Sequence, residues 1–377
     1  MLLSIIVPTK NRQFTALFAI KSALTIPFSD MEVVIQDCSD TNTLLFNILD
    51  EIGNDPRINY YYDSTQPSMT DNWNSAFNRA KGEYLCAIGD DDAVIPNIYE
   101  IALWAKQNEI PAVVQNEFLM YFWPDYKPSE MAGKLYRNSI IQNKIEIFDD
   151  IKNKIRNYST LRNHLTYIYL PQAYHCIFSN KIRKNLIDRT GFFLDGTSVD
   201  VYSAIAFSSV IDTYGKCYFP FTIRGACSTS NSQRITKREM RKHFKEYKKI
   251  NLPKEVPPGN DMFTTISESF IVACKNTGQE KLISNIDLPM LYGNIVLWDW
   301  KNFFVCCKKL FQNVTTIKGK IHFFTYLLKC KVYGLIKFFR IVNSKKSFSS
   351  FSKHENVLEA VFSINSEASF KNPIKDK

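Results

Sequence analysis

Residues 71–96 read DNWNSAFNRAKGEYLCAIGDDDAVIP, and this stretch decides the fold. Its first half predicts a helix over residues 71–80, which ends before the helix-breaking Gly82. Residues 83–88 are mostly apolar and predict a buried strand. That strand runs directly into three adjacent aspartates, which we call the acidic triplet: Asp90, Asp91 and Asp92.

The chain before this stretch alternates short strands with helices. Strands are predicted over residues 2–7, 32–35 and 58–62, and helices over residues 14–24 and 44–52. Strands and helices that alternate at this spacing indicate βαβ units. We therefore expect an α/β fold with a mostly parallel sheet flanked by helices.

Polar residues follow these strands at the points where the strands end. Residues 9–12 and 36–40 follow the first two strands, and the acidic triplet follows the fourth. Ligands of parallel α/β sheets bind at the carboxyl ends of the strands. These residues are therefore expected to form one active site at one edge of the sheet.

The 377 residues allow one large domain and an extension, or two domains. We expect the α/β domain over residues 1–225 and a helical extension over residues 226–300. A basic amphipathic helical segment follows over residues 301–346. Residues 347–377 are rich in Ser, Asn and Lys and are expected to form a poorly ordered tail.

The positive charge is concentrated toward the C-terminus. Lys plus Arg number 47 against 37 Asp plus Glu, a formal net charge of +10. Residues 301–346 contain eleven basic and no acidic residues, which leaves 36 basic and 37 acidic residues elsewhere. A second basic run covers residues 234–249. Because the body is not basic and contains no recognisable nucleic-acid module, no nucleic-acid partner is expected.

Lysines alternate with phenylalanines in residues 301–346, a composition that suits a helix lying on an anionic membrane surface. The alternative is a soluble helical hairpin that packs on the body and extends its lysines into solvent. No stretch reaches the roughly 18 apolar residues of a membrane-spanning helix. The short apolar start lacks the basic region of a signal peptide.

Nine cysteines without a CxxC pattern are typical of free thiols in a reducing compartment. We therefore expect a cytoplasmic protein that contacts the inner face of the cell membrane.

Three adjacent aspartates repel one another unless a cation offsets their charge. Oxygen ligands suit Mg²⁺ or Mn²⁺, which bind through one or two carboxylates together with substrate phosphates. Gly89 just before the triplet leaves room for a diphosphate to approach the backbone. The alternatives are a solvated loop and an Asp-rich helix N-terminus.

Three ordered blocks, residues 3–12, 32–40 and 71–96, resemble family 2 glycosyltransferases of the GT-A fold. The resemblance covers roughly residues 1–225 and implies an inverting, metal-dependent enzyme that uses Mn²⁺ or Mg²⁺. Such an enzyme moves one sugar from a nucleotide-diphosphate sugar, here with a UDP-sugar favoured, to an acceptor hydroxyl. The implied acceptor is a saccharide or a lipid-linked saccharide in cell-surface polysaccharide or glycolipid biosynthesis.

The resemblance also implies which residues bind the nucleotide. Pro8, Thr9 and Arg12 would line the nucleotide pocket after the first strand. Asp37 would accept a hydrogen bond from the base. The family carries an aspartate at the preceding position, where this chain has Gln36.

The acidic triplet would share the work around the diphosphate. Aligned on Pro96, the resemblance assigns metal binding to Asp91 and Asp92. The family's first aspartate falls on Gly89, so the ribose contact is assigned to Asp90 instead.

An inverting transfer needs a general base to take the proton of the acceptor hydroxyl. Residues 190–200, TGFFLDGTSVD, resemble the family's base region, and Asp200 matches best. Asp195 is the alternative base. A purely structural interpretation is that Asp200 is an ordinary aspartate at a helix N-terminus. The QxxRW motif of processive synthases is absent, which favours single addition.

The sequence is less consistent with two other functions. A sugar-phosphate nucleotidyltransferase would carry a Gly-rich loop after the first strand, and residues 8–12 contain no glycine. A nucleic-acid-binding protein could use the basic segment. The body of this chain is acidic, however, and it contains no recognised nucleic-acid module.

Overall fold

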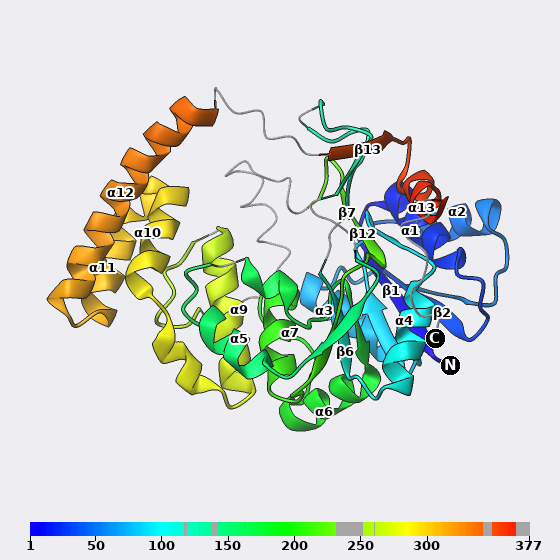
Figure 1. Cartoon of the computed structure of the whole chain (residues 1–377), viewed down its shortest axis with the longest axis horizontal. Helices are drawn as coiled ribbons and strands as arrows, with labels where there is room; N and C mark the ends of the chain where they lie inside the picture. The colour runs from blue at the N-terminus through cyan, green and yellow to red at the C-terminus, as the bar shows by residue number, and fades with distance from the viewer. Residues whose placement is uncertain are drawn as a thin grey trace.

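The computed structural model describes residues 1–116, 119–127, 129–137, 142–163, 165–230, 252–259, 261–341 and 349–366. The basic run 234–249 lies outside the described residues. In Figure 1 the helices α10, α11 and α12 lie at one end of the molecule and α1, α2 and α13 at the other, with the main sheet between them.

The main sheet has eight strands in the order β3-β2-β1-β4-β10-β6-β11-β9. Its first four strands pair in parallel, as predicted. They are β1 (Leu3–Thr9), β2 (Met31–Asp37), β3 (Ile58–Tyr62) and β4 (Tyr84–Ala87). The helices between them are α1 (Gln13–Leu24), α2 (Thr43–Glu51) and α3 (Met69–Arg79). The predicted alternation of strands and helices is confirmed for this half.

The second half of the sheet is mixed. The strand β10 (Cys176–Ser179) inserts antiparallel between β4 and β6 (Ala112–Gln115). Beyond them, β11 (Tyr214–Cys217) is parallel to β6, and the edge strand β9 (Ile145–Phe148) is antiparallel to β11. The α/β class is confirmed, but the mostly parallel order holds only for the first half.

A second sheet of five strands, in the order β13-β8-β7-β12-β5, lies beside the turn that follows β4. Its strands are β5 (Ala93–Val94), β7 (Leu119–Phe122), β8 (Lys134–Arg137), β12 (Thr222–Ala226) and β13 (Ser349–Lys353). The consecutive strands β11 and β12 therefore belong to different sheets, β11 to the main sheet and β12 to the second.

The C-terminal segment returns to the N-terminal half instead of forming a poorly ordered tail. The strand β13 pairs with β8, and α13 (Val357–Ser366) packs against α1 and β5. The buried face of α13 consists of Val357, Ala360, Val361 and Ile364. Their helical spacing explains the difference, because it gives the helix an apolar face to bury. The expected tail was wrong for residues 349–366.

The remaining described helices are α4 (Ile98–Gln107), α5 (Ile151–Tyr158), α6 (Asn180–Thr190), α7 (Val199–Ser208), α9 (Met262–Asn276), α10 (Leu288–Trp298), α11 (Phe303–Asn313) and α12 (Ile317–Ile341). Three short 3₁₀ helices, η1 (Thr166–Tyr169), η3 (Glu280–Asn285) and η4 (Trp300–Asn302), connect them. One hydrophobic core runs from the main sheet through α7 and α9 to α10–α12. The predicted helical extension thus shares its core with the α/β domain.

The nine cysteines all lie in the described residues, and none forms a disulfide. None of the helices in the described parts of the chain is both long and apolar enough to cross a membrane.

Candidate active site

The acidic triplet lies in the turn between β4 and β5, at the edge of the sheet where β1 and β2 also end. Asp90, Asp91 and Asp92 are 3%, 5% and 0% exposed, so the triplet is not a solvated loop. It is not a helix N-terminus either, because α4 begins only at Ile98. Three consecutive buried carboxylates need partners that compensate their charge.

The end of β1 and the turn that follows it supply the first of these partners. The Arg12 guanidinium lies with Nη1 2.8 Å from Asp90 Oδ1 and 3.4 Å from Asp91 Oδ1. The Thr9 hydroxyl donates to Asp90 Oδ2 at 2.7 Å. The structure thus brings two of the predicted nucleotide-binding residues onto the triplet itself. Part of the positive charge that the triplet requires comes from Arg12.

Asp92 is held by three hydrogen-bond donors and lies close to His175. Its Oδ1 accepts from the backbone N–H of Gly225 at 2.7 Å. Its Oδ2 accepts from the N–H of Gly89 and from the Tyr174 hydroxyl, both at 2.6 Å, and lies 3.1 Å from Nε2 of His175. Burial opposes ionisation of Asp92, yet His175 and these donors lower its pKa to about 2. Asp92 is therefore an ionised, fixed anchor of the turn.

Asp91 is less completely satisfied than its neighbours. Its Oδ2 accepts from the Ser230 hydroxyl, with the Cys227 thiol at 3.6 Å. Among the described residues, the charged partner of its Oδ1 is the Arg12 guanidinium at 3.4 Å, whereas Asp90 Oδ1 lies 2.8 Å from the same guanidinium. Burial raises the pKa of Asp91 to about 7, in spite of the Arg12 charge. This oxygen is the one best able to take a further cation.

Two glycines allow the turn to close. A Cβ at Gly225 would lie 1.7 Å from the carbonyl oxygen of Asp91, so β12 reaches the triplet only without a side chain there. A Cβ at Gly89 would lie 2.8 Å from Asp92 Oδ2. We expected Gly89 to make room for a diphosphate. In the structure that room holds the carboxylate of Asp92.

Asp37, at the end of β2, is 0% exposed. Its Oδ1 accepts from the N–H of Ser39 at 2.8 Å, and its Oδ2 accepts from the Tyr60 hydroxyl at 2.7 Å. Burial and the hydrogen bond to Asp37 raise the pKa of Tyr60. In β1, Pro8 is buried and pairs in register with Gln36. These residues shape the wall of the site, and a contact between Asp37 and a base stays a prediction.

Asn11, which no sequence motif singled out, joins the two polar turns. Its side chain donates to Asp40 Oδ2 at 3.1 Å and accepts from the Asp40 N–H at 2.9 Å. Its own N–H donates to the Ser39 hydroxyl at 2.7 Å. These bonds lock the ends of β1 and β2 together beside the triplet.

Asp200 lies in the first turn of α7 and is half-buried. Its Oδ2 accepts from the Tyr167 hydroxyl at 3.0 Å, and its Oδ1 accepts from the Ser198 hydroxyl and from the N–H of Val201. The alternative base, Asp195, accepts from the Asn276 side chain at 3.2 Å. Both carboxylates therefore have polar neighbours that orient them.

The loop before Asp200 is fixed by α9. The Ser269 hydroxyl accepts from the N–H groups of Thr197 and Ser198, at 3.1 and 2.8 Å. The buried Glu268 accepts from the same Thr197 N–H at 3.0 Å. A helix from outside the predicted α/β domain thus positions the predicted base.

One short segment connects the predicted base with the triplet. Tyr167 on η1 donates to Asp200, and Tyr174, seven residues later, donates to Asp92. The Arg224 guanidinium, on β12, lies 5.3 Å from the centre of the Tyr174 ring. No motif in the sequence pointed to these tyrosines or to Arg224.

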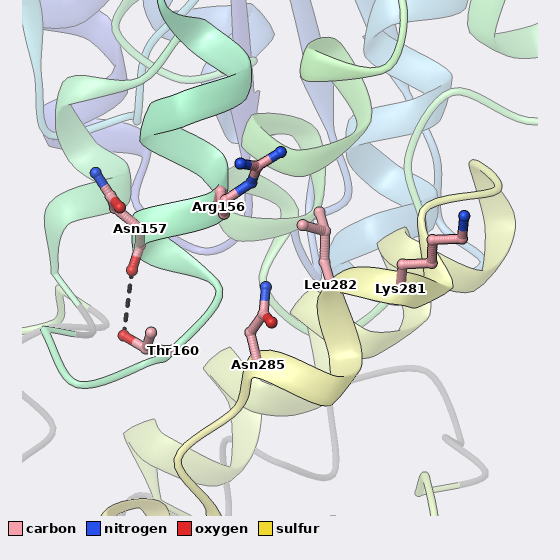
Figure 2. A pocket seen from close by; sticks show the side chains of 6 residues that line it. All are labelled: Arg156, Asn157, Thr160, Lys281, Leu282 and Asn285. Carbon is pink, nitrogen blue, oxygen red and sulfur yellow. Dashed lines mark hydrogen bonds between the residues drawn. The ribbon is translucent and has the colours of Figure 1, made fainter.

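A separate cavity of about 530 Å³ lies between the end of α5 and η3 (Figure 2). It is lined by Arg156, Asn157, Thr160, Lys281, Leu282 and Asn285. None of the predicted site residues lines it, and it contains no carboxylate.

The site lies within a segment that matches a known family. Residues 4–175 match the family model described as "Glycosyl transferase family 2". This segment contains the triplet, the ends of β1 and β2, and both Tyr174 and His175. The resemblance predicted from three sequence blocks is confirmed for these residues.

Part of the chain is similar to two curated proteins. Over 156 residues the chain is 38% identical to the "Putative colanic acid biosynthesis glycosyl transferase WcaA" of Escherichia coli (strain K12). The matched region covers 38% of this chain and 56% of the relative. Over 111 residues the chain is 32% identical to the "GalNAc(5)-diNAcBac-PP-undecaprenol beta-1,3-glucosyltransferase" of Campylobacter jejuni, which covers 28% of this chain and 35% of the relative. The chain thus spans about half or less of the curated relatives that it matches.

Among solved structures, S. aureus TarS 1–349 is 14% identical, with a TM-score of 0.45 over 83% of this chain and 92% of that chain.

Proposed function

We propose that this protein is an inverting glycosyltransferase. It would move a single sugar from a nucleotide-diphosphate sugar, with a UDP-sugar favoured, to a hydroxyl of a saccharide or lipid-linked saccharide during cell-surface polysaccharide or glycolipid biosynthesis. The observation that carries the proposal is the buried acidic triplet at the strand ends of a segment that matches glycosyl transferase family 2.

The residues present fit a divalent cation at Asp91. Mg²⁺ and Mn²⁺ prefer oxygen ligands and need only one or two carboxylates besides the substrate phosphates. Within the described residues, no group of three or more His, Cys, Asp or Glu side chains is arranged as a preformed metal site. A single ligand, Asp91 Oδ1, completed by the donor diphosphate, agrees with this. Such an ion would neutralise charge on the departing nucleotide diphosphate.

Asp92 was predicted as the second metal ligand, but both of its oxygens already accept hydrogen bonds. We therefore assign Asp92 to positioning of the turn.

Arg12 is the residue placed to respond to the donor. Its side chain is 18% exposed, whereas the side chains of Asp90 and Asp91, with which it pairs, are 4% and 8% exposed. When Asp91 gains another positive partner, the guanidinium can turn to a phosphate oxygen of the donor. Asp90, held by Thr9, then keeps Arg12 in place. In this proposal Pro8, Thr9 and Asp37 form the nucleotide wall, and Asp90 faces the ribose.

Asp200 would act as the general base. One of its oxygens takes the proton of the acceptor hydroxyl while the acceptor oxygen bonds to the anomeric carbon. On the opposite face, the bond from that carbon to the diphosphate oxygen breaks, so the configuration inverts. The hydrogen bonds from Tyr167 and Ser198 orient the carboxylate for this step. Asp195 remains the alternative base.

The test compares Asp91→Asn and Asp200→Asn in a transfer assay with nucleotide-sugar and Mn²⁺. Both changes should lower kcat by about 10² to 10⁴. Only Asp91→Asn should also weaken metal-dependent donor binding, whereas Asp200→Asn should bind the donor normally. Asp188→Asn, at an exposed position on α6, is the matched control and should keep full activity. Full transfer activity in Asp91→Asn would rule out the proposal.

A further inference from the structure

The helices α11 and α12 carry an exposed apolar face that no described part of the chain covers. On α12 the exposed stripe consists of Ile317, Ile321, Phe324 and Leu328, which are 76%, 56%, 44% and 66% exposed. Their spacing of four, three and four residues places them on one side of the helix. On α11, Phe304 and Phe311 are 82% and 59% exposed and lie seven residues apart, again on one side. We call these six side chains the apolar ridge.

The helices that carry the ridge also pack against the rest of the protein. Another side of α12, roughly 110° around the helix axis from the stripe, buries Phe323 and Leu327, which are 0% and 5% exposed, in the main core. The Tyr326 hydroxyl donates to Asn294 of α10 at 2.7 Å. Both helices therefore have a stable inner face, and the ridge is their second, outward face. Figure 1 places them at the end of the molecule far from α1 and α13.

Cations flank the ridge on both sides. At about 100° per residue, Lys318 and Lys329 fall on one side of the α12 stripe and Lys320 on the other. The Lys320 ammonium also lies 5.0 Å from the centre of the Phe311 ring, which joins the α11 and α12 parts of the ridge. The sequence contains no Asp or Glu between Asp299 and Glu355. The ridge is thus apolar in the middle and cationic at its margins.

We propose that the apolar ridge is a docking surface for an anionic phospholipid bilayer. Apolar side chains would enter the boundary between headgroups and acyl chains, while the flanking lysines contact anionic headgroups. A second copy of the chain fits less well, because two ridges facing each other would bring only positive margins together. The proposal assigns the two interpretations of residues 301–346 given above to two different faces of the helices. The docking does not depend on the transfer reaction.

The test is sedimentation of the full-length protein with vesicles, without donor or metal. Wild type should sediment with phosphatidylcholine vesicles that contain phosphatidylglycerol, should stay in solution with phosphatidylcholine alone, and should dissociate as salt rises. Replacing Lys318, Lys320 and Lys329 by Gln should lower the partition coefficient about 100-fold, or about fivefold for each lysine. Replacing Ile317, Ile321 and Leu328 by Ser should lower it at least about tenfold.

Matched controls come from elsewhere on the surface. The lysine control is Lys81→Gln, Lys127→Gln and Lys184→Gln, and the apolar control is Phe46→Ser with Leu49→Ser on α2. Both should sediment like wild type, and all variants should keep the melting temperature of wild type. Equal binding to both vesicle types, or wild-type binding by the two ridge variants, would overturn the proposal. So would a dimer in light scattering that the ridge variants abolish, because the ridge would then bind a second copy.

Discussion

The acidic triplet and the apolar ridge are two regions of this molecule where charge gathers, and they handle charge in opposite ways. In the triplet, buried carboxylates are matched by partners within the protein, such as Arg12 and the N–H of Gly225. At the ridge, lysines surround exposed apolar side chains, and the nearby sequence has no carboxylate. The comparison indicates that the triplet is preformed for a small charged ligand, whereas the ridge needs a partner from outside the chain.

The sharpest way to break this comparison is to remove the internal counter-ion of the triplet. Arg12→Gln should lower the free energy of unfolding by about 3 kcal/mol, because it leaves buried carboxylates without their cation. Urea unfolding measures the effect, and Mn²⁺ alone should restore more stability to Arg12→Gln than to wild type. The control is Lys21→Gln, which breaks the exposed pair with Glu51 and should cost less than about 1 kcal/mol. Equal losses in the two variants would contradict a compensated, buried triplet.

A second comparison separates the buried and exposed apolar faces of the C-terminal helices. Ile364→Ala removes a fully buried side chain of α13 and should cost about 2 to 4 kcal/mol. Leu328→Ala on the ridge, 66% exposed, should change the free energy of unfolding by less than about 0.5 kcal/mol. Thermal or urea unfolding of both variants checks the difference. A large loss from Leu328→Ala would mean that the ridge packs within the protein.

The smallest expected effect on the free energy of unfolding concerns the buried carboxylate Glu268. Its hydrogen-bond donors among the described residues, the Thr197 N–H and the Ser269 hydroxyl, are uncharged. Burial raises its pKa, so its folded form holds a proton more tightly than its unfolded form. The associated stability is present below the unfolded pKa near 4.5 and is lost as pH rises through the raised pKa. Glu268→Gln should therefore unfold at higher urea than wild type at about pH 8, with a smaller difference at about pH 5. The exposed change Glu109→Gln should show no such difference, and identical pH slopes in wild type and Glu268→Gln would refute the assignment.

The parts of the structure that local sequence determines could be predicted. Runs such as residues 32–35 form strands because β-branched residues are buried on both faces, and polar turns follow them. The gathering of Thr9, Arg12 and the triplet at one edge follows from parallel strand order. Asp200 was found only through family resemblance, and its role remains a prediction.

What could not be predicted depends on distant pairing. Gly225 and Ser230 reach the triplet from more than 130 residues away, and nothing near them in sequence signals a contact with Asp92 or Asp91. The two-residue strand β5 is too short to leave a periodic pattern. The return of α13 to α1 is likewise a tertiary event that the Ser- and Lys-rich residues before it conceal.

The central claim is that the triplet, through Asp91, is the donor site, and that the ridge takes no part in donor binding. Calorimetric titration of UDP with Mn²⁺ tests it on three proteins: wild type, Asp91→Asn, and the ridge variant with Ile317, Ile321 and Leu328 replaced by Ser. The account predicts equal binding by wild type and the ridge variant, and binding at least about tenfold weaker by Asp91→Asn. Undiminished, Mn²⁺-dependent binding by Asp91→Asn would contradict it.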